Sequence, residues 1–180
     1  MTTSITNYYK NIIIYDLITK LNLKNTFQIP KIIKINLNIT CKKQDIKKNK
    51  LIYILFFLNI LTNQKPCFTK PKATLKIKQN KITGCKITLR RQSIFLFLEK
   101  IIFFILPDNS NFIFNKKIKN IFNFKILNLM KFIEFKNEFF KFKELSFLSL
   151  DVSIHTNCKN NQQLYLLLNN FFFTKIAKIT

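Results

Sequence analysis

The chain has 180 residues, of which 31 are lysine or arginine and only 8 are acidic, so its formal charge is +23, while 48% of its residues are hydrophobic. This hydrophobic content excludes a disordered basic tail, because it is enough for one packed core of ordinary single-domain size. The charge argues against a freely diffusing monomer, because it repels itself unless a polyanion neutralises it.

The first third of the chain predicts a helix, a half-buried strand and a second helix. The helices are expected at 7–21 and 50–61. The segment 31–39 alternates with the period of a strand. Its apolar face is expected to hold Ile33, Ile35, Leu37 and Ile39, and its polar face Lys34, Asn36 and Asn38. The apolar run at 51–61 is shorter than the roughly 20 residues of a membrane-spanning helix, so we interpret it as a buried core helix.

The middle third is the most basic part of the chain. From 65 to 91 there are nine basic residues and no acidic one. Two strands are expected here, at 74–78 and 86–90, because apolar and polar residues alternate in both segments. Gly84 is the only glycine, and a backbone with positive φ is expected at this position before the second strand. A core helix is expected at 92–106.

The last third begins with a less regular segment. Residues 108–148 alternate Phe and Ile with Asn and Lys, and we interpret them as a hairpin with loops. A strand with the same alternation as the others is expected at 150–155. A helix is expected to follow at 159–169.

Together these elements predict an α+β architecture, an antiparallel sheet with helices packed on one face, of the ferredoxin-like or RRM-like kind. A single domain, 1–180, is expected, with an N-terminal half at about 20–78 and a C-terminal half at about 82–175. The other face of the sheet is expected to be basic and to bind RNA, because lysines neutralise phosphates and Asn and Thr bond to phosphate, ribose or bases. Its outward positions carry few aromatic residues, which favours structured RNA over a stacked single strand.

The residues present do not favour catalysis or metal binding. The chain has four cysteines and one histidine, which are Cys41, Cys67, Cys85, Cys158 and His155. With no CxxC pair, the cysteines are expected to be reduced thiols that behave as small hydrophobic residues. A chain with one glycine has no nucleotide-binding glycine loop. We interpret His155 as a surface or contact residue, and we expect no catalytic residue, metal or cofactor.

The run from Gln64 to Arg90, QKPCFTKPKATLKIKQNKITGCKITLR, resembles the fifth large-subunit ribosomal protein of the bacterial type. The family pattern there is close to QKP, TKA, KIRQ and GCKVTLR. Three further pieces fit in the same order, at 8–10, 30–38 and 150–173. The resemblance therefore covers nearly the whole chain, although 108–148 is matched only by position.

The resemblance implies a structural constituent of the large ribosomal subunit, with no small-molecule substrate. Such proteins bind 5S rRNA in the central protuberance, contact peptidyl-site tRNA through a protruding loop and bridge to a small-subunit head protein; neighbouring large-subunit proteins and rRNA are further partners. By matching position, the 5S contacts are Asn38, Gln64, Thr88 and Arg90, and the polar face and basic run add Asn36, Lys65, Lys86 and Arg91. The tRNA-side loop is expected to hold Lys70, Lys72, Thr74, Lys76 and Lys78.

The chain departs from the family pattern at two places. After Asn38 the family has a glycine-rich turn, whereas this chain reads ITCK at 39–42. Between Lys70 and Lys76 this chain has five residues, fewer than bacterial relatives have. This difference predicts a shortened loop on the tRNA side.

A mitochondrial location is expected. The match begins at Tyr8, which leaves no room for a cleaved import sequence, and Phe, Ile, Asn and Lys, whose codons are rich in A and T, make up 101 of the 180 residues. A plastid or a very AT-rich bacterium is the alternative location. The alternative function is a basic membrane-surface protein of an organelle, suggested by the Phe-rich and Lys-rich segments at 112–142. Such a protein would expose contiguous Phe, whereas a ribosomal protein would bury Phe and expose Lys.

Overall fold

The computed structural model describes residues 4–41, 48–71, 82–105, 112–114, 120–136 and 148–171. In these residues six strands form one antiparallel sheet in the order β2-β3-β1-β6-β5-β4. The strands are β1 (Ile32–Thr40), β2 (Cys67–Thr69), β3 (Gly84–Leu89), β4 (Phe112–Phe114), β5 (Ile121–Ile126) and β6 (Leu150–Thr156). The α-helices are α1 (Ser4–Tyr8), α2 (Ile14–Leu21), α3 (Lys48–Thr62), α4 (Gln92–Lys100), α5 (Ile133–Lys136) and α7 (Asn161–Asn170).

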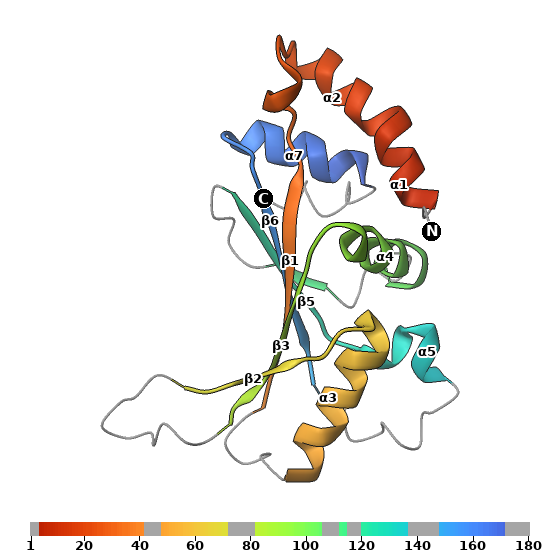
Figure 1. The fold of residues 1–180 in the computed structure, drawn as a ribbon, viewed down its shortest axis with the longest axis vertical. Helices are drawn as coiled ribbons and strands as arrows, with labels where there is room; N and C mark the ends of the chain where they lie inside the picture. Colours follow the sequence, from red (N-terminus) through yellow and green to blue (C-terminus); the bar gives the residue numbers. More distant parts are fainter. Residues whose placement is uncertain are drawn as a thin grey trace.

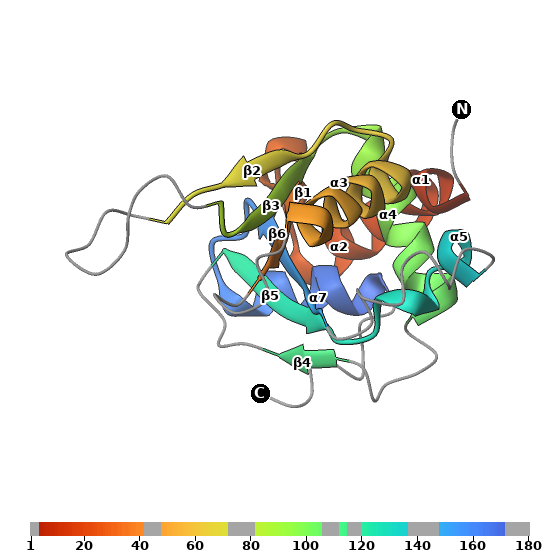
Figure 2. The same cartoon turned by 90° about the horizontal axis from the view of Figure 1, so that it is seen from below.

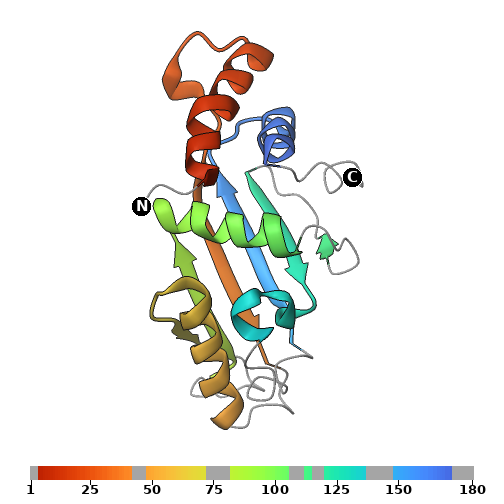
Figure 3. The same cartoon turned by 90° about the vertical axis from the view of Figure 1, so that its right-hand side faces the viewer.

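The helices cover one side of this sheet. Figure 3 looks onto that side, where α4 crosses the sheet, α3 and α5 lie below α4, and α1 and α7 lie near the upper end. The opposite side carries no helix of the described part across its centre and is open to the left in Figure 1. Figure 2 shows the edge strands β2 and β4 far apart, with the other strands between them. The expected α+β architecture, with helices on one face of an antiparallel sheet, is confirmed.

The hydrophobic core lies between the helices and the apolar face of the central strands. The strand residues in it are Ile35, Leu37, Ile39, Cys85, Ile87, Leu89, Phe122, Phe124, Ile126, Leu150, Val152 and Ile154. Phe57 of α3 stacks on Phe135 at a centroid distance of 4.3 Å and meets Phe132 edge-on at 6.3 Å. Burying such a side chain contributes roughly 1.5 to 3 kcal/mol.

The helices expected at 7–21, 92–106 and 159–169 are present with shifted ends. The first begins at Ser4, and a π-helical turn at Tyr9–Ile13 joins α1 to α2. It ends where Asn22 adopts a left-handed φ of 47° and donates its backbone N–H to the carbonyl of Ile18, a common way to end a helix. After α4 the chain continues through a second π-helical turn, Ile101–Ile105.

The expectation for Ile33 is wrong. Ile33 is expected on the apolar face of the first strand, but it is 49% exposed. The pairing of β1 with β6 shifts register between Ile32 and Lys34, and an extra residue at such a bulge changes the side to which a side chain points. The three apolar residues that follow at alternate positions are fully buried, as expected.

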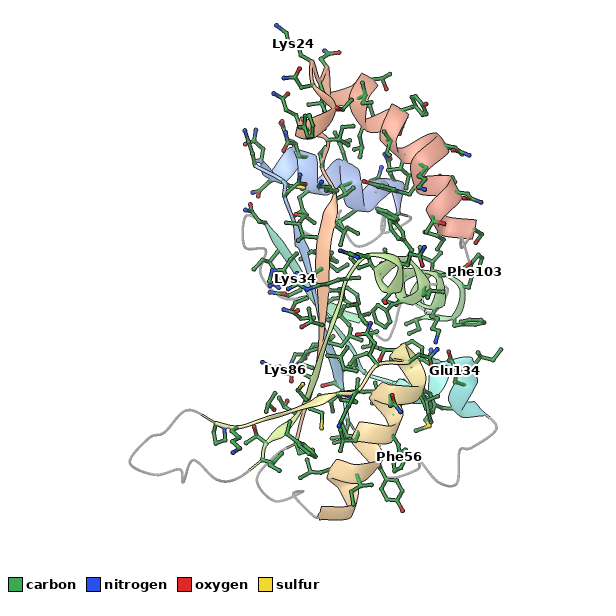
Figure 4. All side chains as sticks on the ribbon, viewed as in Figure 1. Lys24, Lys34, Phe56, Lys86, Phe103 and Glu134 are labelled. Atoms are coloured by element: carbon green, nitrogen blue, oxygen red, sulfur yellow. The ribbon has the colours of Figure 1, made fainter. Side chains whose placement is uncertain are left out.

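The helix expected at 50–61 is present as α3, but only one side of it is buried. The buried side holds Leu51, Ile54, Phe57, Leu58 and Leu61, and the outer side holds Ile52, Tyr53, Phe56 and Ile60, which are 37% to 56% exposed. Figure 4 shows Phe56 pointing away from the sheet. The interpretation of α3 as a buried core helix therefore holds for its inner side only, and its outer side is exposed apolar surface.

The role of Gly84 is steric, and the expected positive φ is absent. Gly84 pairs with Thr40 of β1, and a Cβ atom placed on Gly84 would lie 2.1 Å from the carbonyl oxygen of Ile39. No side chain fits in that space. The glycine therefore allows β1 and β3 to approach each other at this end of the sheet.

The expected strand at 74–78 and the expected hairpin within 108–148 have different outcomes. The strand expected at 74–78 lies outside the described residues. Within 108–148, β4 and β5 pair antiparallel from Phe112 opposite Ile126 to Phe114 opposite Phe124. The hairpin interpretation is therefore confirmed for these two strands, whereas the part expected as loops contains a 3-10 turn at Leu129–Lys131 and helix α5.

A half-buried lysine joins three helices. Lys100, the last residue of α4, donates from Nζ to the carbonyl oxygen of Leu61 in α3 at 2.8 Å and pairs with Glu134 of α5 at 2.5 Å. The Lys100 and Glu134 side chains are 25% and 21% exposed. The bond to Leu61 also satisfies one of the carbonyl groups that have no partner within the last turn of α3.

Candidate nucleic-acid interface

The open side of the sheet, which we call the polar face, carries three rows of side chains. The strand register aligns Lys86, Asn38, Asp151 and Lys125 in one row, Thr88, Asn36, Ser153 and Asn123 in the next, and Lys34, His155 and Ile121 in the third. These residues are exposed or half-buried, whereas the residues between them on each strand are buried under the helices. Figure 4 shows Lys34 and Lys86 on the open side.

A chain of hydrogen bonds holds the centre of the polar face. Thr88 Oγ1 donates to Asn36 Oδ1 at 3.1 Å, and Asn36 Nδ2 lies 3.0 Å from His155 Nε2. Because an amide nitrogen can only donate, His155 Nε2 accepts and carries no proton. Burial, together with the positive charge of Lys34, lowers the pKa of His155. The three side chains are therefore held in place before any ligand binds.

The neutral state of His155 predicts a loss of stability in acid. Because folding lowers the pKa of His155, stability from this site is fully present above the ordinary value of 6.5 and declines as the pH falls below it. We expect the free energy of unfolding of His155→Gln to fall less than that of the parent between neutral and mildly acidic pH. Urea denaturation across that range measures the difference, and identical pH dependence of both proteins would contradict the prediction.

The positive charge of the polar face is concentrated on β1 and β3. Lys125 of β5 lies 3.3 Å from Asp151 Oδ1, so this lysine is partly neutralised. Among the described residues no carboxylate lies within ion-pair distance of Lys34 or Lys86. These two lysines are available for an external anion such as phosphate.

Four of the expected rRNA-binding residues, Gln64, Lys65, Arg90 and Arg91, lie in or beside the connection between β3 and α4. Arg90 and Arg91 directly follow β3 and are exposed, as is Lys65. Gln64 Nε2 donates to Ser93 Oγ of α4 at 3.0 Å, which holds the segment after α3 against the start of α4. We call Gln64, Lys65, Arg90 and Arg91 the corner. The other four expected residues, Asn36, Asn38, Lys86 and Thr88, are on the polar face.

The loop expected on the tRNA side follows β2. Lys70 is exposed and comes directly after β2, which pairs with β3 through Thr69 opposite Gly84. The other four residues expected in this loop, Lys72, Thr74, Lys76 and Lys78, lie outside the described residues.

Seven residues of the polar face are not among the expected rRNA contacts, namely Lys34, Ile121, Asn123, Lys125, Asp151, Ser153 and His155. Lys34, Ser153 and His155 occupy polar positions of strands whose alternation is visible in the sequence. Asn123 lies in β5, where the alternation from Ile121 to Ile126 is equally regular. The alternation that places Asn123 on the polar face is therefore present in the sequence. It is hard to recognise, because Phe, Ile, Asn and Lys recur throughout the surrounding segment.

The buried thiols have the character of structural residues. Cys41, Cys85 and Cys158 are buried and Cys67 is exposed, and none forms a disulfide. Burial, together with the neighbouring Cys41, raises the pKa of Cys85 to about 11, and burial raises the pKa of Cys158. Such thiols stay protonated near neutral pH and are poor nucleophiles. Within the described residues no three His, Cys, Asp or Glu side chains lie close enough together to hold a metal ion.

Known proteins resemble the chain over nearly its whole length. No family model matches it. However, the large ribosomal subunit protein uL5 of Buchnera aphidicola subsp. Cinara cedri is 34% identical over 170 residues, which cover 92% of this chain and 94% of that protein. The chain belongs to the uL5 family. The uL5 of Blochmanniella floridana is 30% identical over 176 residues, or 93% of this chain and 90% of that protein.

A mitochondrial relative is also similar. The protein named uL5m of Prototheca wickerhamii is 37% identical over 103 residues, which cover 56% of this chain and 45% of that protein. Membership of the uL5 family makes the chain a structural ribosomal protein and not an enzyme. Its place is a ribosome of mitochondrial or bacterial type.

Proposed function

We propose that this uL5 protein is a constituent of the large ribosomal subunit that holds 5S rRNA in the central protuberance through its polar face. The observation that carries the proposal is the register of β3, β1 and β6, which brings Lys86, Asn38, Thr88 and Asn36 onto one open side of the sheet. Unpaired lysines attract phosphates, and amide and hydroxyl groups bond to phosphate, ribose or base edges.

The corner contributes to the same interface. Its residues Lys65, Arg90 and Arg91 are exposed, and Arg90 and Arg91 continue β3 directly beyond Thr88 and Leu89. The polar face and the corner together offer an RNA helix a continuous series of basic and amide groups, which suits recognition by backbone and shape. Other large-subunit rRNA is a further proposed partner.

The proposal includes contacts with moving parts of the ribosome. The segment that begins at Lys70 is proposed to approach tRNA in the peptidyl site, with Lys72, Thr74, Lys76 and Lys78 as further candidates. The resemblance at 64–90 supports this assignment, as does β2, the edge strand of the sheet that ends directly before Lys70. A bridge to a small-subunit head protein and contacts with neighbouring large-subunit proteins complete the proposed partners.

The proposed location is the mitochondrion, with the protein made inside the organelle. The similarity to a protein named uL5m supports a mitochondrial ribosome. The dominance of Phe, Ile, Asn and Lys supports a very AT-rich genome, as expected of an organelle.

The burial of phenylalanine in the segment that suggested membrane binding favours this function over a membrane-surface protein, although Phe27, Phe56, Phe68, Phe103 and Phe104 are exposed elsewhere in the described residues. Within the described part of the chain the buried phenylalanines are Phe57, Phe97, Phe122, Phe124, Phe132, Phe135 and Phe171. Four of them, from Phe122 to Phe135, lie in the segment that suggested membrane binding. No described helix is long and apolar enough to cross a membrane.

Lys86→Ala is expected to weaken binding to a 5S rRNA fragment by about 1 to 3 kcal/mol, because an unpaired charge in the polar face is lost. The slope of log K against log salt is expected to become shallower by about one unit. Lys24→Ala is the matched control, since Lys24 is also exposed and lies at the far end of the molecule from Lys86 (Figure 4). Fluorescence anisotropy over a series of salt concentrations measures both quantities.

Equal losses for the two variants would contradict a specific role for the polar face. A parent protein whose binding does not respond to salt would favour apolar, membrane-like association instead. Sedimentation of the native protein tests the assembly itself, and we expect it with the large ribosomal subunit. Its absence from those fractions would refute the proposal.

A further inference from the structure

Arginine occurs at one place only in this chain. The sequence has 29 lysines and two arginines, and the two arginines, Arg90 and Arg91, are adjacent in the corner. If the corner needed positive charge alone, the lysine that serves everywhere else in the chain would supply it. A guanidinium differs from an ammonium because it presents N–H donors in a rigid planar fork, which matches two oxygens of one phosphate.

Arg91 has a backbone conformation suited to glycine. Its φ is 53° and its ψ is −126°, a combination that glycine adopts freely and that strains a residue with a side chain. The other non-glycine residues with positive φ in the described ranges are Asn22 and Asn63, and asparagine tolerates positive φ better than other residues do. Arg91 is therefore a large charged residue where the fold would be less strained with glycine.

The surroundings leave both guanidinium groups available. No acidic residue occurs from 65 to 91. In the described part of the chain, no carboxylate forms an ion pair with Arg90 or Arg91. The bond between Gln64 and Ser93 is the local contact that fixes the corner, and it uses neither arginine.

We propose that Arg90 and Arg91 form a paired guanidinium anchor for the RNA backbone, and that Arg91 keeps a strained backbone because neither lysine nor glycine supplies the second fork. This inference rests on the proposed rRNA binding and deepens it. The many lysines attract the polyanion, whereas the two forks fix where its phosphates lie on the protein.

Three substitutions at Arg91 separate strain from binding. Arg91→Gly is expected to raise the Tm by about 2 to 4 °C through relief of strain, and to weaken binding to a 5S rRNA fragment roughly tenfold or more. Arg91→Ala is expected to lose affinity equally without gaining stability, because alanine is also strained at positive φ. Arg91→Lys is expected to keep the Tm and the salt slope of the parent but to lose affinity, because it keeps the charge and loses the fork.

Two control variants make each outcome decisive. Asn22→Gly removes a residue with positive φ far from the corner without changing charge, and it is expected to leave RNA affinity unchanged. Arg90→Ala is expected to weaken binding as Arg91→Ala does. If Arg91→Gly or Arg91→Lys binds as tightly as the parent while Arg90→Ala and Lys86→Ala bind weakly, the anchor proposal is overturned and rRNA binding stands. If all of these variants bind as the parent does, both proposals fail.

Discussion

Gly84→Ala is expected to destabilise the protein by at least about 3 kcal/mol, because its Cβ would lie 2.1 Å from the carbonyl oxygen of Ile39. The collision is with the backbone of the neighbouring strand, so no change of side-chain rotamer relieves it. Strands β1 and β3 would have to separate where Gly84 pairs with Thr40, and β3 is the strand that joins β2 to the rest of the sheet. Urea denaturation followed by circular dichroism measures the loss.

Thr88→Ala is the control for Gly84→Ala on the same strand. Thr88 is exposed and its side chain makes one hydrogen bond, to Asn36, so its loss is expected to cost about 1 kcal/mol. If Gly84→Ala were no more destabilising than Thr88→Ala, the close approach of the two strands would not require glycine.

Lys100→Met is expected to destabilise the protein by about 2 kcal/mol, because it leaves the Leu61 carbonyl and the half-buried Glu134 without their partner. The value is below that for a fully buried pair, since the Lys100 and Glu134 side chains are 25% and 21% exposed and solvent screens them. Lys20→Met is the matched control. It breaks the pair with Asp16, whose side chains are 45% and 39% exposed, and such a pair contributes at most about 1 kcal/mol.

A double variant tests whether the unpaired carboxylate causes the loss at Lys100. Lys100→Met with Glu134→Leu is expected to recover part of the stability, because no charge is then left half-buried without a partner. Thermal unfolding of the parent, Lys100→Met, Glu134→Leu and the double variant measures the coupling free energy between the two side chains. A double variant that is as unstable as Lys100→Met alone would show that the bond to Leu61, rather than the ion pair, supplies the stability.

The polar face could be predicted from the sequence because alternation along a strand is a local signal. Asn36, Asn38, Lys86 and Thr88 alternate with apolar neighbours, and the structure has them on the open side of the sheet. Ile33 shows where this reasoning fails, because its face depends on a bulge in the pairing with β6, a strand more than a hundred residues away. The sequence alternates through Ile33 whether or not the bulge exists.

Other features depended on backbone geometry that composition does not encode. Gly84 stood out as the only glycine, but its role depends on the carbonyl of Ile39, which only strand pairing brings close. The strain at Arg91 leaves no mark in the sequence, because an arginine does not by itself indicate a positive φ. The exposure of the outer side of α3 could not be predicted either. Apolar residues occur on every side of that helix, so its sequence has no helical periodicity that would mark Phe56 as exposed.

The exposed side of α3 sets the conditions under which the RNA-free protein stays dissolved. Phe56, Ile52 and Ile60 would draw two copies together, while the charge of +23 keeps them apart. Salt shortens the reach of that repulsion, from about 10 Å at 0.1 M to about 3 Å at 1 M, and leaves the apolar attraction in place. High salt dissociates RNA from lysine-rich surfaces. It therefore removes the bound polyanion and at the same time screens the repulsion between copies of the protein. The free protein is therefore expected to be most soluble at low ionic strength, where it also holds RNA most tightly.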